Sequence, residues 1–282
     1  MQLGIVADEI SRDFREAVRV GKSLGIARYE VRFLKTGRAP LCDPGEIAEV
    51  ERIADGEGVK VTALSPGLFK WTDDAQAFGE EMRELFPLAA EWANRWRLPG
   101  LIVFGFHKPD ATEELFYRSE QIPAHVHDWF AEAGAEAQKA GLKLMIEPEP
   151  VCWLDTGRVA VELIAKIASD ALRLNYDPGN VAWLLGKDPL EELETVAPFI
   201  SNLHIKDLRA LKSRGQVNEK AGPQWTVPGN GVIDYRAHFR LLKRLGYDGP
   251  VSLEPHMDGT RETTEECLRA VEALLKETES AL

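Results

Sequence analysis

Polar residues of the metal-binding type end four consecutive apolar runs in the second half of the chain. They are Glu147, Asp177, His204 and Glu254. Three carboxylates and one imidazole suit a divalent cation. Because this set holds no thiolate, we expect a hard ion: Mn²⁺ is the first choice, and Mg²⁺, Co²⁺ or Zn²⁺ are alternatives. Any one of these residues alone is commonly a helix cap or a structural histidine. Together they predict one metal centre.

Such a centre would act as a Lewis acid on a substrate with neighbouring oxygens. The predicted ligand set leaves coordination positions open for two substrate oxygens, and a vicinal hydroxy-carbonyl group fits them. A cation placed there polarises the carbonyl and acidifies the adjacent C–H bond. The residues therefore indicate an enzyme that binds one divalent metal ion and acts on a small, sugar-like carbonyl compound.

Short apolar runs alternate with helical patterns along the whole chain. The runs are continuous rather than alternating, which is typical of parallel strands that are covered on both faces. Strands are predicted at residues 3–7, 28–33, 59–64, 100–106, 142–146, 172–176, 200–205 and 251–253. Helices are predicted at residues 13–24, 44–56, 74–96, 112–140, 157–169, 189–196, 235–245 and 260–277.

Eight βα units in 282 residues predict an α/β fold, a single (β/α)8 TIM barrel that spans residues 1–282 as one domain. An open doubly wound sheet is the alternative, but no G-x-G-x-x-G follows the first strand to support dinucleotide binding. In a barrel the carboxyl ends of the strands meet around the active site. The predicted metal ligands stand at these ends, so the fold brings them to one place.

Several short motifs carry a family resemblance. They are IEPEP at 146–150, NYDPGN at 175–180, LHIKD at 203–207, SLEPH at 252–256 and the G-x-G-x-I-D-Y segment at 229–235. With these motifs the chain resembles the sugar phosphate isomerase/epimerase superfamily, the xylose-isomerase-like TIM barrels, along essentially its whole length. The resemblance implies the same metal tetrad, and it implies that Glu147 and Glu254 are also acid/base groups on opposite faces of the substrate.

Three activities fit such a centre. The first is an isomerase or epimerase of a sugar or sugar phosphate, which abstracts the proton alpha to a carbonyl and passes through an enediolate. The second is a lyase that makes the same abstraction and then loses water from a keto-sugar or keto-cyclitol, as the inosose and dehydroshikimate dehydratases of the superfamily do. A barrel endonuclease is remote, because the extra histidines of that class are not matched and the net charge is −12.

Further residues are candidates for substrate contacts. His107 ends the predicted fourth strand, and strand alternation turns Lys206 to the same side as His204. Lys206 would bind a phosphate or carboxylate or stabilise an enolate, unless it pairs with Asp207 or Glu254. Three more substrate-binding candidates are Arg209, Asn180, which would otherwise cap a helix, and His256.

Length and composition limit the partners. Residues 209–232 form a long irregular segment with Gly, Pro and Trp225, and we expect a flap over the site. The negative charge argues against nucleic acid, and the sequence lacks the run of about 20 apolar residues that a membrane helix needs. Three scattered cysteines predict reduced thiols and a cytoplasmic location. Whether the chain forms a homo-oligomer is left open by the sequence.

Overall fold

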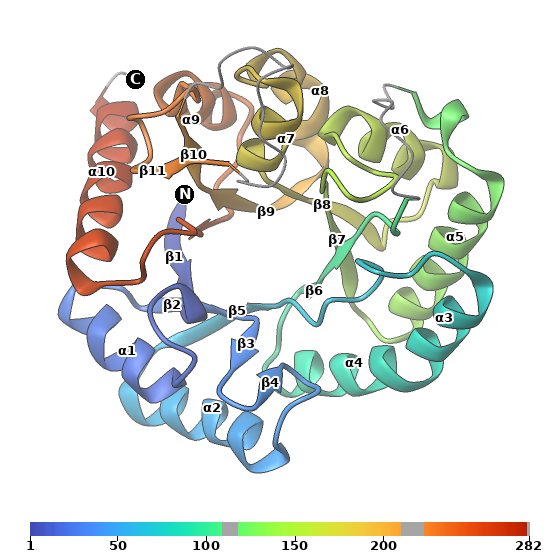
Figure 1. The fold of residues 1–282 in the computed structure, drawn as a ribbon, viewed down its shortest axis with the longest axis horizontal. Coiled ribbons are helices and arrows are strands. Elements are labelled where there is room, and N and C mark those ends of the chain that lie inside the picture. The colour runs from blue at the N-terminus through green and yellow to red at the C-terminus, as the bar shows by residue number, and fades with distance from the viewer. Residues whose placement is uncertain (109–117, 210–222, 281–282) are drawn as a thin grey trace.

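The strands of the computed structural model close into a barrel (Figure 1), and the structure describes residues 1–108, 118–209 and 223–280. The strand order around the barrel is β1-β12-β9-β8-β7-β6-β5-β2, and all neighbouring pairs are parallel. The strands are β1 (Gln2–Val6), β2 (Arg28–Val31), β5 (Lys60–Leu64), β6 (Gly100–Phe104), β7 (Lys143–Glu147), β8 (Leu172–Tyr176), β9 (Ile200–Ile205) and β12 (Pro250–Leu253). The predicted (β/α)8 TIM barrel is confirmed.

Helices form a ring outside the strands (Figure 1). Most begin at a side chain that accepts backbone N–H groups of the first turn, as Asp13, Asp43, Asp74, Thr156 and Asp234 do. The helices are α1 (Phe14–Ser23), α2 (Pro44–Glu57), α3 (Ala75–Glu80), α4 (Phe86–Arg95), α5 (Ala124–Lys139), α6 (Gly157–Ile167), α7 (Pro178–Leu185), α8 (Leu193–Val196), α9 (Tyr235–Arg244) and α10 (Arg261–Ser280).

The predicted helix at 112–140 is wrong at its start. The α5 helix begins only at Ala124, because Pro123 is its N-cap residue and lacks the N–H that an earlier turn would need. Residues 112–117 of that prediction lie outside the described residues. The predicted helix at 74–96 is divided, since a π-helical turn at Glu81–Leu85 separates α3 from α4.

The α7 helix was not predicted, although its sequence holds a capping signal. Asp177 caps it and Pro178 is its first residue, a position where proline is well tolerated. The predicted helix at 189–196 is shorter than expected, because Leu190–Glu192 form a 3₁₀ turn and only Leu193–Val196 are α-helical.

The interior of the barrel changes from apolar to polar along its axis. Ala63, Ile102 and Met145 form a small apolar cluster of their own. Asn175 and Asn202 lie closer to the carboxyl ends of the strands. Both are buried, and a hydrogen bond of 2.9 Å joins them. These asparagines stand two residues before Asp177 and His204, so strand alternation turns each pair to the same face.

Two small sheets lie outside the barrel. Strands β3 (Phe33–Leu34) and β4 (Gly37–Arg38) form a hairpin after β2. Strand β10 (Asp207–Leu208) pairs antiparallel with β11 (Trp225–Thr226). Residues 210–222 of the predicted flap lie outside the described residues. In the part of the chain that the structure describes, no helix is both long and apolar enough to cross a membrane.

Candidate metal centre and active site

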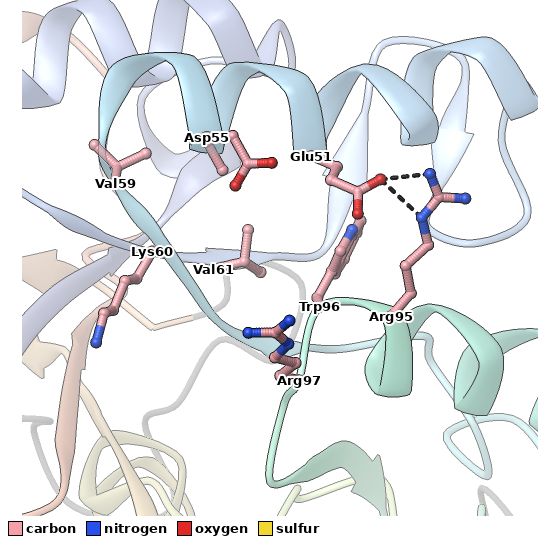
Figure 2. A pocket seen from close by; sticks show the side chains of 9 residues that line it. Glu51, Asp55, Val59, Lys60, Val61, Arg95, Trp96 and Arg97 are labelled. Atoms are coloured by element: carbon pink, nitrogen blue, oxygen red, sulfur yellow. Dashed lines mark hydrogen bonds and ion pairs between the residues drawn. The ribbon is translucent and has the colours of Figure 1, made fainter.

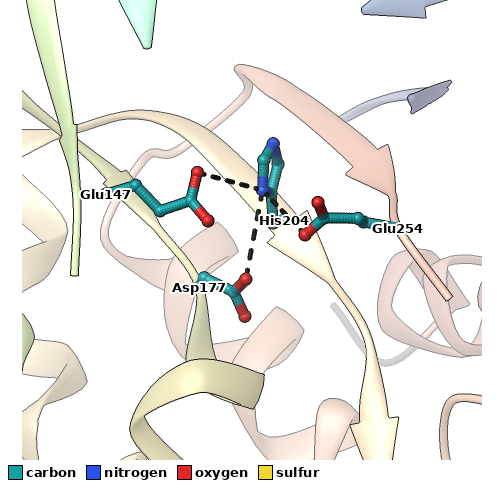
Figure 3. A group of neighbouring side chains, drawn as sticks. All are labelled: Glu147, Asp177, His204 and Glu254. Carbon is teal, nitrogen blue, oxygen red and sulfur yellow. Dashed lines mark ion pairs between the residues drawn. The ribbon is translucent and has the colours of Figure 1, made fainter. Parts of the chain in front are cut away.

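The four predicted metal ligands lie together at the carboxyl ends of β7, β8, β9 and β12 (Figure 3). All are buried, and one ligand atom from each lies within 4.8 Å of the others. His204 Nδ1 is 3.2 Å from Glu254 Oε2, 3.6 Å from Glu147 Oε2 and 4.0 Å from Asp177 Oδ2. One imidazole nitrogen and three carboxylates thus face a common point.

Asp177 uses its two oxygens differently. Oδ1 caps α7 by accepting the backbone N–H groups of Gly179 at 2.8 Å and Asn180 at 3.1 Å. Oδ2 is buried and accepts no well-aligned hydrogen bond from the described residues, although Lys206 Nζ lies 2.6 Å away. The cap fixes the carboxylate so that its other oxygen faces the tetrad.

His204 is oriented by a buried carboxylate of β2. Its Nε2 lies 3.1 Å from both oxygens of Glu30, and Asn202 Nδ2 donates to Glu30 Oε2 at 3.3 Å. A carboxylate behind a histidine fixes the ring and leaves the opposite nitrogen for a metal. Burial lowers the pKa of His204, but Glu30, Glu254 and Glu147 together raise it well above its usual range.

Glu147 and Glu254 are held by different kinds of donor. The Glu147 oxygens accept from two neutral amides, Asn175 Nδ2 at 2.9 Å and Asn180 Nδ2 at 3.3 Å. The Glu254 oxygens accept from two cations, Lys206 Nζ at 2.9 Å and the Arg32 guanidinium. Burial raises the pKa of both glutamates, but neighbouring charges outweigh it, so that of Glu147 is lowered and that of Glu254 lies well below its usual range.

Charged neighbours extend this network toward the rim of the barrel. Arg32 also pairs with Asp8 and Glu9, each at 2.9 Å. His256 Nδ1 lies 3.0 Å from Glu9 Oε1 and its Nε2 lies 3.5 Å from Glu254 Oε1. Arg32 thereby ties one metal-ligand candidate to two carboxylates of the β1 end.

Lys206 is a buried cation beside the tetrad. Its ammonium contacts Asp177 and Glu254, and it lies 5.3 Å from the centre of the Trp225 ring. The predicted alternative of a pair with Glu254 is present. A pair with Asp207 is not, because Asp207 instead accepts backbone N–H groups of the loop before α9.

A cavity of about 270 Å³ opens above the tetrad. Its lining residues are Arg32, Phe33, Arg38, Ser65, Lys70, Trp71, Phe104, Glu147, Glu149, His204, Lys206, Glu254 and His256. A larger hollow of about 530 Å³, shown in Figure 2, is lined by residues of α2 and by Lys60 and Val61 at the start of β5. That hollow lies at the amino ends of the strands, so the smaller cavity over the tetrad is the candidate substrate site.

The other predicted contacts are divided between the cavity and its surroundings. Lys206 and His256 line the cavity. Asn180 lies behind Glu147 and donates to it, and His107 forms an isolated β-bridge with Cys152. Arg209 is exposed, outside the residues that line the cavity.

Several residues that surround the site were not predicted from the sequence. Asn175 and Asn202 carried a signal, because each is a polar residue inside an apolar run, two positions before a ligand. Arg38 and Lys70 carried none, since both lie in irregular segments between predicted elements. The hairpin β3–β4 and the loop after β5 bring them to the cavity.

The tetrad fits a divalent cation. Asp177 Oδ2, which accepts no well-aligned hydrogen bond, the His204 Nδ1 that faces away from Glu30, and one oxygen of each glutamate converge from four strands. Carboxylate and imidazole ligands in this ratio suit Mn²⁺, Mg²⁺, Co²⁺ or Zn²⁺. Asn175 and Glu30 would orient the ligands from behind, as outer partners in metal sites do.

The sequence profile of the xylose isomerase-like TIM barrels matches residues 18–276, and the chain belongs to this family. The resemblance seen in the motifs is confirmed. Among curated relatives, an inosose dehydratase of Serratia proteamaculans is 28% identical over 156 residues, 52% of each chain. One of Lacticaseibacillus casei is 26% identical over 132 residues, 44% of each chain. The chain spans about half the length of the curated relatives it matches.

Solved structures share the barrel over nearly the full length. The IolI protein with a bound zinc atom has a TM-score of 0.78 at 19% identity and covers 99% of both chains. The probable 3-DHS dehydratase AsbF of Bacillus anthracis has a TM-score of 0.76 at 16% identity, covering 96% of this chain and 99% of that one. At these identities the likeness shows the fold.

Proposed function

We propose that this protein is a metal-dependent lyase that removes water from a small hydroxy-keto compound. The observation that carries the proposal is the unequal setting of the two glutamates. Both oxygens of Glu254 accept hydrogen bonds from cations, whereas those of Glu147 accept from neutral amides. A carboxylate paired with two cations is a weak base. Glu147 is therefore the group that takes a proton, and Glu254 serves as a ligand.

One base on one face suits elimination better than epimerisation, which needs an acid/base group on each face of the substrate. Glu147 removes the proton on the carbon alpha to the keto group, and the electron pair moves toward the keto oxygen. When this pair returns to form the C=C bond, the β-hydroxyl leaves and takes the proton from Glu147, so that water is released. A bound divalent ion would polarise the keto group.

Lys206 supplies fixed positive charge for this step. Its ammonium is buried, lines the cavity and is held by Asp177 and Glu254. Burial lowers the pKa of Lys206, but the surrounding carboxylates raise it above its usual range, so the group stays charged. A preorganised cation facing the developing enolate stabilises it without reorganisation.

The names of the relatives also support a lyase ahead of an isomerase. Those quoted above carry the name inosose dehydratase, and a structural neighbour is titled a probable 3-DHS dehydratase. Isomerisation, which the motifs favoured, becomes the second candidate. Both activities share the metal and the proton abstraction, and they differ only in whether water is lost.

Product mass distinguishes the two. Purified protein loaded with Mn²⁺, and separately with Mg²⁺, Co²⁺ or Zn²⁺, would be incubated with inosose, with 3-dehydroshikimate and with keto-sugars. We expect a product lighter by one water molecule, formed in the wild type and absent after His204→Ala. A product that has the substrate's mass in ordinary water and is one mass unit heavier in deuterium oxide would contradict the lyase and establish the isomerase.

A further inference from the structure

Arg38 presents a guanidinium to the cavity from the β3–β4 hairpin. Its Nε donates to the Ser65 carbonyl at 2.9 Å and its Nη2 to Ser65 Oγ at 2.8 Å. The Phe33 and Phe104 rings lie 5.1 and 5.6 Å from the guanidinium carbon. All of these neighbours are neutral, so they fix the position of the guanidinium without compensating its charge.

The other cations that line the cavity each have a carboxylate partner. Arg32 pairs with Glu254, Lys206 pairs with Asp177 and Glu254, and Lys70 pairs with Glu149 at 2.5 Å. Within the described ranges, no carboxylate lies within 4.0 Å of the Arg38 nitrogens. A guanidinium has five N–H donors, and Ser65 takes two, so three N–H groups of Arg38 have no described protein partner.

The backbone opposite Arg38 is shaped to leave it room. Gly67 has a φ of +89°, and a Cβ there would lie 2.9 Å from Arg38 Nε. Burial lowers the pKa of Arg38 to about 10, which still keeps the guanidinium charged at neutral pH. A fixed, charged and unpaired guanidinium in a cavity wall is a binding group for an anion.

We propose that Arg38 binds a carboxylate of the substrate, so that the cavity accepts a cyclic hydroxy-keto acid in preference to a neutral keto-cyclitol. This inference rests on the proposed function for the metal end of the cavity. A sphere of 270 Å³ is about 8 Å across, room for one six-membered ring between the tetrad and Arg38. The keto and hydroxyl oxygens then face the tetrad while the carboxylate faces Arg38.

A carboxylate fits this wall better than a phosphate does. Its single charge matches one guanidinium, and its two oxygens match the planar fork of N–H donors. A phosphate monoester carries about −1.5 to −2 charges and three acceptor oxygens. The other cations that line the cavity, Arg32, Lys70 and Lys206, are already paired with carboxylates, so a second negative charge would have no partner.

Binding tests the subsite without any turnover. The probes are 3,4-dihydroxybenzoate, its methyl ester and the corresponding phosphonate, titrated calorimetrically into Mn²⁺-loaded protein. We expect the wild type to bind the acid about 100-fold more tightly than the ester, the scale of a lost buried charge partner. In Arg38→Met and Arg38→Gln the two affinities should become nearly equal.

Arg12→Met is the matched control, because Arg12 lies 4.9 Å from the Phe33 ring and does not line the cavity. It should keep the wild-type preference for the acid. Equal affinities in the wild type, a preference that survives both Arg38 substitutions, or tighter binding of the phosphonate would overturn the carboxylate subsite. If the wild type prefers the acid to the ester but dehydrates no substrate, the proposed function would be contradicted, whereas the carboxylate subsite would not.

Discussion

At the scale of single residues, the ligand candidates Asp177 and His204 share one arrangement: the protein holds one side of each group in place, and the other side faces the centre. Asp177 gives Oδ1 to its helix cap and turns Oδ2 inward. His204 directs Nε2 to Glu30 and Nδ1 to the other ligands. The orienting bonds are fixed by the fold, so the ligands need little rearrangement when a cation binds.

The two glutamates should respond differently to the same substitution. Glu147→Gln removes the proposed base, and we expect turnover to fall by about 10²–10⁴ with the metal largely retained. Glu254→Gln leaves two cations facing a neutral amide, and we expect the metal itself to be lost. Metal content after dialysis and turnover at saturating metal measure the two effects. Equal losses of turnover in metal-loaded forms of both variants would contradict the assignment of one base.

Glu30 should act on the metal through His204. In Glu30→Gln the imidazole loses a charged partner on Nε2, and we expect metal affinity to fall by about 10–100-fold, the usual cost of losing an outer partner. Glu192→Gln is a matched control, because Glu192 is also buried but accepts from Tyr176 rather than from a tetrad residue. Titration with Mn²⁺ decides the matter, and equal affinities in the two variants would refute the orienting role of Glu30.

At the scale of the elements, the segment after β9 is organised by one carboxylate. Asp207 accepts the backbone N–H groups of Leu208, Gly229, Gly231 and Ile233 at distances of 2.9–3.3 Å. Gly231 must be glycine here, because a Cβ would lie 2.1 Å from Asp207 Oδ1. This clamp joins the two ends of a long connection directly beside Lys206.

Loss of the clamp should destabilise the fold. In Asp207→Ala several buried N–H groups lose a charged acceptor, and we expect the free energy of unfolding to fall by about 3 kcal/mol. Asp207→Asn keeps one acceptor oxygen and should lose less. Urea unfolding of both variants measures the difference. Wild-type stability of Asp207→Ala would show that water replaces the carboxylate at no cost.

The sequence was informative where function depends on position within a regular element. The metal-ligand candidates end apolar strands. Because eight alternating strand and helix patterns predict a barrel, the sequence was enough to place these residues at the carboxyl-end rim of that barrel. Arg38 belongs to a hairpin of four paired residues whose contact with the cavity depends on the path of the loops. The extra turns before α5 were predicted from helical composition, whereas Pro123 determines where that helix begins.

At the scale of the whole molecule, the barrel concentrates negative charge at one end of its axis. Glu30, Glu147, Asp177 and Glu254 are all buried there, with Lys206, Arg32 and His204 as the nearby positive or ionisable partners. Carboxylates buried at this density repel one another unless cations compensate them. A divalent ion at the tetrad would add that compensation, so metal binding and stability of the barrel should be linked.

Metal removal should therefore lower the unfolding temperature. A ligand that binds only the folded state at 100 times its Kd adds about 2.7 kcal/mol to the free energy of unfolding, which corresponds to roughly 5 °C for a domain of this size. We expect that rise when Mn²⁺ is added to chelator-treated wild type, measured by calorimetry at constant ionic strength. Because metal ligands must be deprotonated, the rise should shrink as the pH is lowered from about 7 to about 5. His204→Ala, which removes one ligand but keeps the carboxylates, should show little rise at any pH. An equal rise in that variant would mean that the ion binds and stabilises another part of the surface. The tetrad would then not be the metal site.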